Sequence, residues 1–485
     1  MSQYFSLIQK FSLIGLTNLL YGLQGLILLP LLSKNLSIGD YGIWIQILVT
    51  IGLIPSLVML GLPYTMVRFL AGKKTKKSIQ EVYYSILGII LISGGIASII
   101  IFFLSYFIAK FLFNGFTDIV NLLAIVIFIE CIIQLQYNYF RALQKTKKYS
   151  FFFLIRVFLQ ILLASIFVLS GYGIFGALFG YCIANFFIML VMTSQIILEI
   201  GIIAPKFLNV KEFISFGFPT VPGNLSMWTV RMSDRYLIGL TLGTMYVGYY
   251  APGYELGNII SIFIAPLSFL LPAVLSKYYD ENRKSEVNFI LVNSLKFFLI
   301  FSIPSVVGLS FLSKPILTVL STNEIASESY LITPFVAIST LLFGVYVIVG
   351  QVHILEKNTK LLGVVWIIAG AINLILNIIL LPFIGIIAAA LTTLIAFSIA
   401  LLITLYYSRD YFPNELFFVI KKIFPRILIS SILFAPIIIY LNPNGIITIT
   451  FVILLSGLMY LLTFTMIGGF TNDEIKFIKK LTYRK

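Results

Sequence analysis

Long apolar runs recur along the whole chain, and they constrain the fold more than any other feature of the sequence. A helix needs about 20 apolar residues to cross the hydrocarbon core of a bilayer. The 485 residues are 60% hydrophobic and only 11% charged, far from the composition of a soluble domain. Because the runs are unbroken, we predict an all-α polytopic membrane protein with about fourteen transmembrane helices. They are expected at residues 11–32, 41–62, 82–106, 118–139, 150–170, 173–197, 215–240, 247–272, 289–312, 328–350, 361–381, 384–406, 423–441 and 445–467.

Basic residues are distributed unevenly between the predicted loops. Nearly all lysines and arginines outside the spans fall on the side of the two chain ends, and only Lys34, Lys110 and Lys314 fall on the other. Because short basic loops stay in the cytoplasm, we expect a multi-pass protein of the cytoplasmic (inner) membrane with both termini inside. The net charge of +15 is then explained by orientation and by anionic lipid headgroups, and nucleic acid is not an expected partner.

Residues for catalysis or ATP binding are missing from the sequence. It has no GxxxxGK[ST] phosphate loop, and its single histidine, His353, has no Cys or His neighbour for a metal site. Cys131 and Cys182 both fall in predicted spans, so no disulfide framework is expected. The loops are too short to form a soluble catalytic domain. We therefore predict a transporter rather than an enzyme, with no catalytic residue, no metal and no cofactor.

An internal repeat divides the chain. The segment from Gln144 resembles the segment from Glu356, and in both a basic turn is followed by a span, a glycine hairpin and a helix rich in small residues. The repeat predicts two six-helix lobes of the same orientation, with substrate bound between them. The expected division is 1–212 for the N-terminal lobe, 213–408 for the C-terminal lobe, and 409–485 for two further helices and a cytoplasmic tail.

Charged and polar residues gather on the seventh predicted span. Residues three and four apart share one face of a helix, so Asn224, Trp228, Arg231 and Arg235 form a stripe with Asp234 beside it. The hairpin near Gly243 has Arg231 twelve residues before it and Glu255 twelve after it, so we expect the two side chains at similar depth. The candidate substrate-binding residues are Arg231, Arg235, Asp234, Glu255, Asn224, Trp228, Asn258, Asn18, Gln24 and Gln46.

Two interpretations of these charges stay open at this point. Either the residues form a salt-bridge cluster that fixes the helices, or they line a wet cavity that receives a charged substrate. Other polar positions lie elsewhere in the spans. Glu130, Gln134, Asn138 and Arg141 form a stripe on the fourth span, whereas Arg156 and Lys296 lie near span ends, where long basic side chains reach back to water.

Several motifs, taken in order, resemble one known family. They are LLSKNLSIGDYGIW from Leu31, GLPYTMVRFLAG from Gly61, YFRALQKTKKYS from Tyr139, GYGIFGALFGY from Gly171 and MSDRYLIGLTLGTMYVGYYAPGYELG from Met232. The chain resembles the polysaccharide-transporter (Wzx-type) flippases of the MOP exporter superfamily, relatives of the lipid II flippase and of the MATE antiporters. The resemblance covers essentially the whole chain.

This resemblance implies two lobes around a cavity that opens alternately to either side. The implied substrate is a polyprenyl-diphosphate-linked oligosaccharide, a precursor of O-antigen, capsule or a similar surface glycan. Arg231 and Arg235 would meet the diphosphate, since a guanidinium binds phosphate oxygens bidentately. Implied partners are membrane lipids and glycosyltransferases or a glycan polymerase, with H⁺ or Na⁺ as possible coupling ions. Two alternatives are a MATE-like cation-coupled drug antiporter and a non-transporting scaffold of a glycan-assembly complex.

Overall fold

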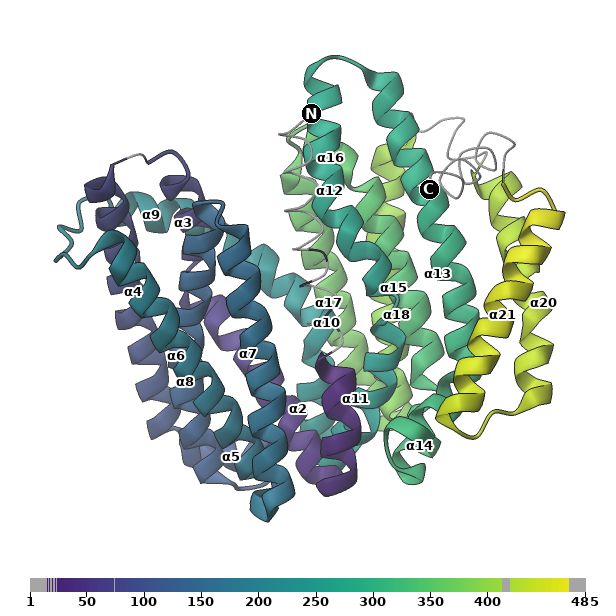
Figure 1. Cartoon of the computed structure of the whole chain (residues 1–485), viewed down its shortest axis with the longest axis horizontal. Coiled ribbons are helices and arrows are strands. Elements are labelled where there is room, and N and C mark those ends of the chain that lie inside the picture. Colours follow the sequence, from purple (N-terminus) through teal and green to yellow (C-terminus); the bar gives the residue numbers. More distant parts are fainter. Residues whose placement is uncertain are drawn as a thin grey trace, which may run out of the picture. The chain divides into compact units, whose positions relative to one another are not determined.

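The computed structural model describes residues 24–73, 75–411 and 419–470, with a few isolated positions before residue 24. Within these residues all regular structure is helical (Figure 1). By length and composition, 11 helical stretches of the described chain could cross a membrane. The predicted class, an all-α multi-pass membrane protein, is confirmed, whereas the predicted number of fourteen spans is not.

The difference in span number has identifiable causes. The stretch Thr146–Ile200 counts once although it contains two predicted spans, which follow each other without a gap in helical structure but are separated by the non-helical Gly171. The seventh predicted span corresponds to α10 (Val221–Thr241), whose polar stripe leaves it outside the apolar stretches. The first predicted span, 11–32, is described only in part and is not among the 11 stretches.

The chain divides into two compact units. The first comprises Met1–Ala251 and Trp366–Thr392, and the second comprises Pro252–Val365 and Thr393–Lys485. These units follow spatial contacts, whereas the predicted lobes follow the sequence repeat, so the lobe boundaries at 212 and 408 stay a prediction. Besides α10 and the helical residues 24–35, the described α-helices that lie wholly within the first unit are α2 (Ile38–Val58), α3 (Leu62–Leu70), α4 (Lys76–Phe103), α5 (Ser105–Leu112), α6 (Thr117–Ala142), α7 (Thr146–Phe167), α8 (Gly173–Ile200) and α9 (Val210–Gly217).

Three further helices are shared between the units along the sequence: α11 (Thr244–Asn258), α17 (Thr359–Ile384) and α18 (Ile386–Ser408). The second unit is built around the long helix α13 (Lys284–Leu320), beside which the C-terminal hairpin α20–α21 stands in Figure 1. Its remaining helices are α12 (Ser261–Asp280), α14 (Asn323–Ser329), α15 (Ile332–Val349), α16 (Gln351–Leu355), α20 (Phe424–Leu441) and α21 (Ile446–Met466).

Both copies of the sequence repeat turn at glycine. Gly173 begins α8 with φ 58°, and Gly385 joins α17 to α18 with φ 67°. A side chain at such a φ is strained, so glycine is the residue that fits the turn. The hairpins α7–α8 and α17–α18 therefore share one local device at matching places in the repeat.

Helix α2 packs against α10, and at its N-terminal end glycine lets it approach the start of α11. The helix begins at Ser37, whose Oγ accepts the backbone N–H of Asp40 at 3.1 Å. At Gly42, a methyl group would lie only 1.8 Å from the carbonyl oxygen of Thr244, so the two backbones are in direct contact. This contact fixes the start of α11 against α2 within the first unit.

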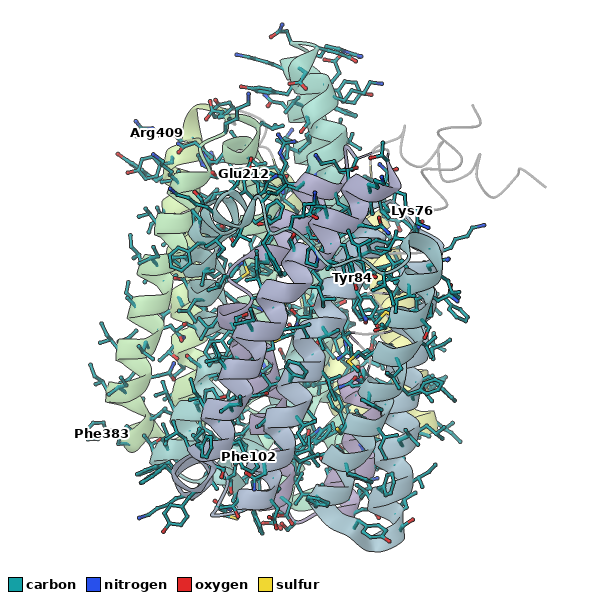
Figure 2. All side chains as sticks on the ribbon, turned by 90° about the vertical axis from the view of Figure 1, so that its left-hand side faces the viewer. Lys76, Tyr84, Phe102, Glu212, Phe383 and Arg409 are labelled. Carbon is teal, nitrogen blue, oxygen red and sulfur yellow. The ribbon has the colours of Figure 1, made fainter. Side chains whose placement is uncertain are left out.

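The connection between the two sequence halves, residues 201–209, is held against α4. Gln80 donates its amide to the carbonyl of Ile200, and the Tyr84 hydroxyl donates to the carbonyl of Gly201 at 2.6 Å. The backbone N–H of Lys206 donates to the Glu81 carboxylate at 2.9 Å. In Figure 2, Lys76 and Tyr84 of α4 lie toward the same end of the first unit as Glu212, while Phe102 lies toward the other end. We define residues 201–209 as the connecting strap.

A proline in α13 leaves one backbone carbonyl without its helical donor, and a tyrosine of the C-terminal hairpin donates to it instead. Pro304 has no backbone N–H, so the carbonyl of Ile300, four residues earlier, loses its helical donor. The Tyr460 hydroxyl on α21 donates to that carbonyl at 2.8 Å. The bond replaces the lost one and ties α21 to α13 within the apolar core of the second unit.

Candidate functional site

The charged helix α10 begins after a short 3₁₀ turn that separates it from α9. Helix α9 ends at Gly217, a short 3₁₀ turn covers Phe218–Thr220, and α10 starts at Val221 with Pro222 in its first turn. Proline is well placed in a first turn because the N–H it lacks would have no helical partner there. The 3₁₀ turn makes α10 a helix distinct from α9, and the predicted polar stripe lies on α10.

Asp234 and Arg235 form an enclosed ion pair on α10. Arg235 Nη1 donates to Asp234 Oδ1 at 2.6 Å, and the two side chains are 2% and 0% exposed. The other carboxylate oxygen, Oδ2, accepts the Tyr250 hydroxyl of α11 at 2.5 Å, and the guanidinium lies 5.4 Å from the ring centre of Tyr250. Arg235 Nη1 also donates to the backbone carbonyl of Arg231 at 2.6 Å. Charge, hydrogen bonds and aromatic contact therefore all hold Arg235 in place.

Arg231 differs from Arg235 in its accessibility. It lies one helical turn earlier on α10 and is partly exposed, whereas Arg235 is buried. A ligand reaching this face of α10 would meet the guanidinium of Arg231 before that of Arg235. The role of both arginines in substrate binding stays a prediction.

The uncharged members of the stripe face α2 and α3. Asn224 Oδ1 accepts the Tyr64 hydroxyl at 3.4 Å, and the Trp228 ring lies 6.0 Å from the ring of Tyr236. Tyr236 in turn shares a 2.5 Å hydrogen bond with Thr50 of α2. Residues predicted from helical spacing alone are thus brought into one surface that continues onto neighbouring helices.

Two polar groups on this surface are buried without a partner in the described residues. Both amide atoms of Gln46 and the indole Nε1 of Trp228 have no hydrogen-bond partner there. Gln46 lies against Gly239, where a methyl group would come within 1.8 Å of its amide nitrogen. Buried polar groups usually have a hydrogen-bond partner, and leaving one unsatisfied costs about 1–3 kcal/mol.

The remaining predicted site residues are distributed differently. Glu255 and Asn258 lie on α11 in the second unit, both half-buried, so the expected proximity of Glu255 to Arg231 stays a prediction. Gln24 donates its amide to Gln160 of α7 at 2.9 Å, whereas Asn18 lies outside the described residues. In the part of the chain that is described, no three His, Cys, Asp or Glu side chains come together to hold a metal ion.

One interpretation from the sequence was wrong. Arg156 does not reach back to the membrane surface, because its Nη2 donates to the Glu130 carboxylate and its Nε donates to Asn185 at 2.9 Å. Lys296, interpreted in the same way, is also buried at 5% exposure. The pair at Arg156 had a sequence signal: counted from Gln144, which has a turn conformation with φ 55°, Glu130 and Arg156 lie at similar depth on consecutive helices.

The second unit holds an apolar cavity of about 530 Å³. It lies beside α13 and the C-terminal hairpin, and Pro304 and Tyr460 contribute to its wall. Nearly all of the other lining side chains are aliphatic or aromatic, among them Phe263, Phe301 and Phe434. A cavity of this volume and chemistry suits a hydrocarbon chain rather than a polar ligand.

The fold and the buried ionic groups define a class of membrane protein. The structure superposes on the lipid II flippase MurJ in an inward closed conformation with a TM-score of 0.74 and 19% identity, over 94% of this chain and 98% of that one. It also superposes on an inward-facing MATE-family multidrug transporter with a TM-score of 0.69 and 13% identity, over 81% and 95% of the two chains. The chain therefore has the fold of MOP-superfamily transporters, and the predicted fold family is confirmed.

The sequence comparison identifies the family within this class. Residues 31–328, more than half of the chain, match the polysaccharide biosynthesis protein family, so the protein belongs to that family. A probable low-salt glycan biosynthesis flippase of Haloferax volcanii is 23% identical over 207 residues. That alignment covers 43% of this chain and 44% of the relative, so the chain spans less than half the length of that protein.

Proposed function

We propose that the protein is a flippase that moves a polyprenyl-diphosphate-linked oligosaccharide from the cytoplasmic to the outer leaflet by alternating access. The observation that carries this proposal is the partly exposed Arg231, next to a fixed Asp234–Arg235 pair, on a helix of an otherwise apolar transporter fold. A guanidinium binds phosphate oxygens through two parallel hydrogen bonds. Family membership and the similarity to a probable glycan biosynthesis flippase of Haloferax volcanii support a glycan precursor as the substrate.

The apolar cavity of the second unit supports the same substrate class. A polyprenyl chain needs an apolar surface while its head group crosses, and the 530 Å³ cavity beside α13 offers one. We place the protein in the cytoplasmic membrane with both termini inside, and we propose glycosyltransferases or a glycan polymerase as partners. Moving two negative charges out of a cytoplasm that is negative by about 100 mV releases about 5 kcal/mol. A gradient of H⁺ or Na⁺ is the alternative driving force.

Transport in liposomes tests this proposal. A fluorescent polyprenyl-diphosphate oligosaccharide would be placed in the inner leaflet and its arrival outside followed with a membrane-impermeant quencher. We expect Arg231→Ala to slow flipping about tenfold, the loss of one charge-assisted hydrogen bond, with unchanged thermal unfolding. Arg283→Ala is the control, because Arg283 belongs to the second unit, is exposed, and pairs with Glu281 and Glu286.

The alternatives give different results in the same assay. Normal flipping by Arg231→Ala would remove the diphosphate role of α10. Cation-driven efflux of small organic cations without lipid flipping would assign the antiporter function that the MATE-like fold also allows. A folded protein that transports neither substrate, yet is needed for glycan assembly in cells, would be a scaffold.

A further inference from the structure

A second buried ion pair lies in the described part of the first unit, outside the candidate site on α10. It joins Glu130 of α6 to Arg156 of α7, whose side chains are 7% and 11% exposed. Both residues lie within stretches that could cross a membrane. An ionised group at this depth costs at least about 2.5–3.5 kcal/mol to insert, so its presence needs a reason.

The pair is the centre of a polar network that extends to four helices. Arg156 Nε and the amide nitrogen of Gln160 both donate to Asn185 Oδ1 on α8, at 2.9 and 2.7 Å. Gln160 also accepts the amide of Gln24 at 2.9 Å, and Gln24 belongs to the helical residues 24–35. A residue that the sequence predicts to contact substrate is therefore connected to Arg156 through two hydrogen-bonded side chains.

The side-chain amide of Asn185 has a donor, Nδ2, that the described network does not use. Its Oδ1 accepts two donors, so the orientation of the amide is settled by its neighbours. Its Nδ2 is fully buried and has no hydrogen-bond partner in the described residues. This N–H can donate to a further acceptor, and the adjacent guanidinium favours an acceptor that carries negative charge, such as a phosphate oxygen.

A purely structural role explains the network poorly. A buried ion pair is often no more stabilising than apolar side chains of the same size, because both charges lose their water. The Asp234–Arg235 pair is completed by Tyr250, whereas the Glu130–Arg156 pair leaves a buried amide unsatisfied. The carboxylate of Glu130 has the charge and the acceptor oxygens that a phosphate would present to Arg156.

We propose that Arg156 and Asn185 form an anion-binding site in the first unit, and that Glu130 occupies it in this structure in place of a phosphate group. The anion is the diphosphate of the lipid-linked substrate, an identification that rests on the proposed flippase function. Glu130 is then a built-in competitor, which keeps the guanidinium neutralised when no substrate is bound.

The substitution Glu130→Gln tests whether Glu130 competes with the ligand or only positions Arg156, because the two roles predict different changes in diphosphate affinity. Glu130→Gln removes the negative charge and preserves the shape and an acceptor oxygen. If Glu130 competes with the ligand, this variant should bind diphosphate about tenfold more tightly, the value of one charge-assisted hydrogen bond. If Glu130 only positions Arg156, the variant should bind with equal or lower affinity, and that result would overturn the proposal.

The binding experiment uses the full chain in phosphatidylcholine nanodiscs, with farnesyl diphosphate and inorganic diphosphate as separate probes and calorimetry as the readout. Arg156→Ala should weaken binding about tenfold. Arg156→Lys keeps the charge but not the paired N–H donors of the guanidinium, so its affinity should lie between those of the wild type and Arg156→Ala. Glu199→Gln is the matched control. Its carboxylate pairs with Lys145 and Lys148 outside the network, so the same change there should leave affinity unaltered.

The two probes identify the source of the anion. A gain by Glu130→Gln for both probes shows that the site takes diphosphate itself, and a gain for farnesyl diphosphate alone shows that it needs the lipid-linked form. If Arg156→Ala does not fold, Glu130→Gln and Arg156→Lys still decide the question. If the wild-type protein binds and flips substrate but the variants bind diphosphate with the wild-type affinity, the inference about Arg156 is overturned and the proposed function stands. A wild-type protein that binds neither probe overturns the proposed function with it.

Discussion

The two buried ion pairs of the first unit have the same chemistry and different construction. Asp234 and Arg235 are neighbours in one helix, are 0% and 2% exposed, and are completed by the Tyr250 hydroxyl. Glu130 and Arg156 come from two helices, keep slightly more exposure, and adjoin an amide donor without a partner. The first pair is saturated with interactions and fixes the backbone of α10. The second pair includes an unused donor, and in our proposal Glu130 occupies the site of an anion. A buried ion pair can therefore stabilise a helix, as Asp234–Arg235 does, or occupy a ligand site, as we propose for Glu130–Arg156.

The largest effect should come from breaking the saturated pair. Asp234→Ala leaves the guanidinium of Arg235 buried without its carboxylate, which typically costs about 3–5 kcal/mol of unfolding free energy. Glu130→Ala should cost less, because Arg156 keeps its bond to Asn185. Thermal and denaturant unfolding of both variants in nanodiscs measures the difference. Equal losses would show that the two pairs are structurally equivalent.

A smaller effect should follow from removing the Tyr250 hydroxyl, which donates to the carboxylate of the same pair. Tyr250→Phe deletes the 2.5 Å hydrogen bond to the Asp234 carboxylate, and a bond to a charged group contributes about 1.5–3 kcal/mol. Tyr246→Phe, an exposed tyrosine on the same helix, is the control and should unfold like the wild type. If Tyr250→Phe is also unchanged, the pair does not depend on α11 for its stability.

A third effect concerns the outer end of the Arg156 network. A double-mutant cycle with Gln24→Ala and Gln160→Ala should give a coupling of about 0.5–1.5 kcal/mol, the value of a neutral hydrogen bond. The cycle of Gln24→Ala with Gln46→Ala is the reference, because Gln46 has no hydrogen-bond partner in the described residues. Additivity in the first cycle would separate Gln24 from the network.

The smallest effect is expected at an exposed ion pair. Arg283 donates to Glu286 at 2.7 Å and to Glu281 at 3.4 Å, with about half of its side chain exposed. Water and salt screen such contacts, so Arg283→Ala should not change the midpoint of thermal unfolding measurably. A clear destabilisation there would mean that burial is not what separates the stabilising pairs from the others.

The sequence predicts the parts of this structure that depend on local patterns. Apolar run length leads to the all-α membrane class, and helical spacing places Asn224, Trp228 and Arg231 on the single helix α10. The glycines of the repeat mark hairpins that the structure contains, at Gly173 and Gly385. Each of these features is determined within about thirty residues of chain, the length of one span with its turn.

The observed pairings between side chains of different helices were not predicted. Spacing along one helix does not reveal which way that helix faces its neighbour, and Arg156 was therefore assigned to the membrane surface instead of to Glu130. Gln24 and Gln160 are separated by 136 residues, and their contact depends on the packing of three helices. The partner of Asp234 on α11, Tyr250, was missed for the same reason, although the hairpin at Gly243 was recognised.

The connecting strap has a consequence for protein engineering. Its backbone is held to α4 by Gln80, Glu81 and Tyr84, and the carbonyl of Phe213, just beyond it, accepts the hydroxyl of Thr65 at 3.0 Å. Both sides of a cut after the exposed Lys206 would thus stay attached to the same surface. The chain could be expressed as two fragments divided there, each labelled separately, and reassembled in one membrane.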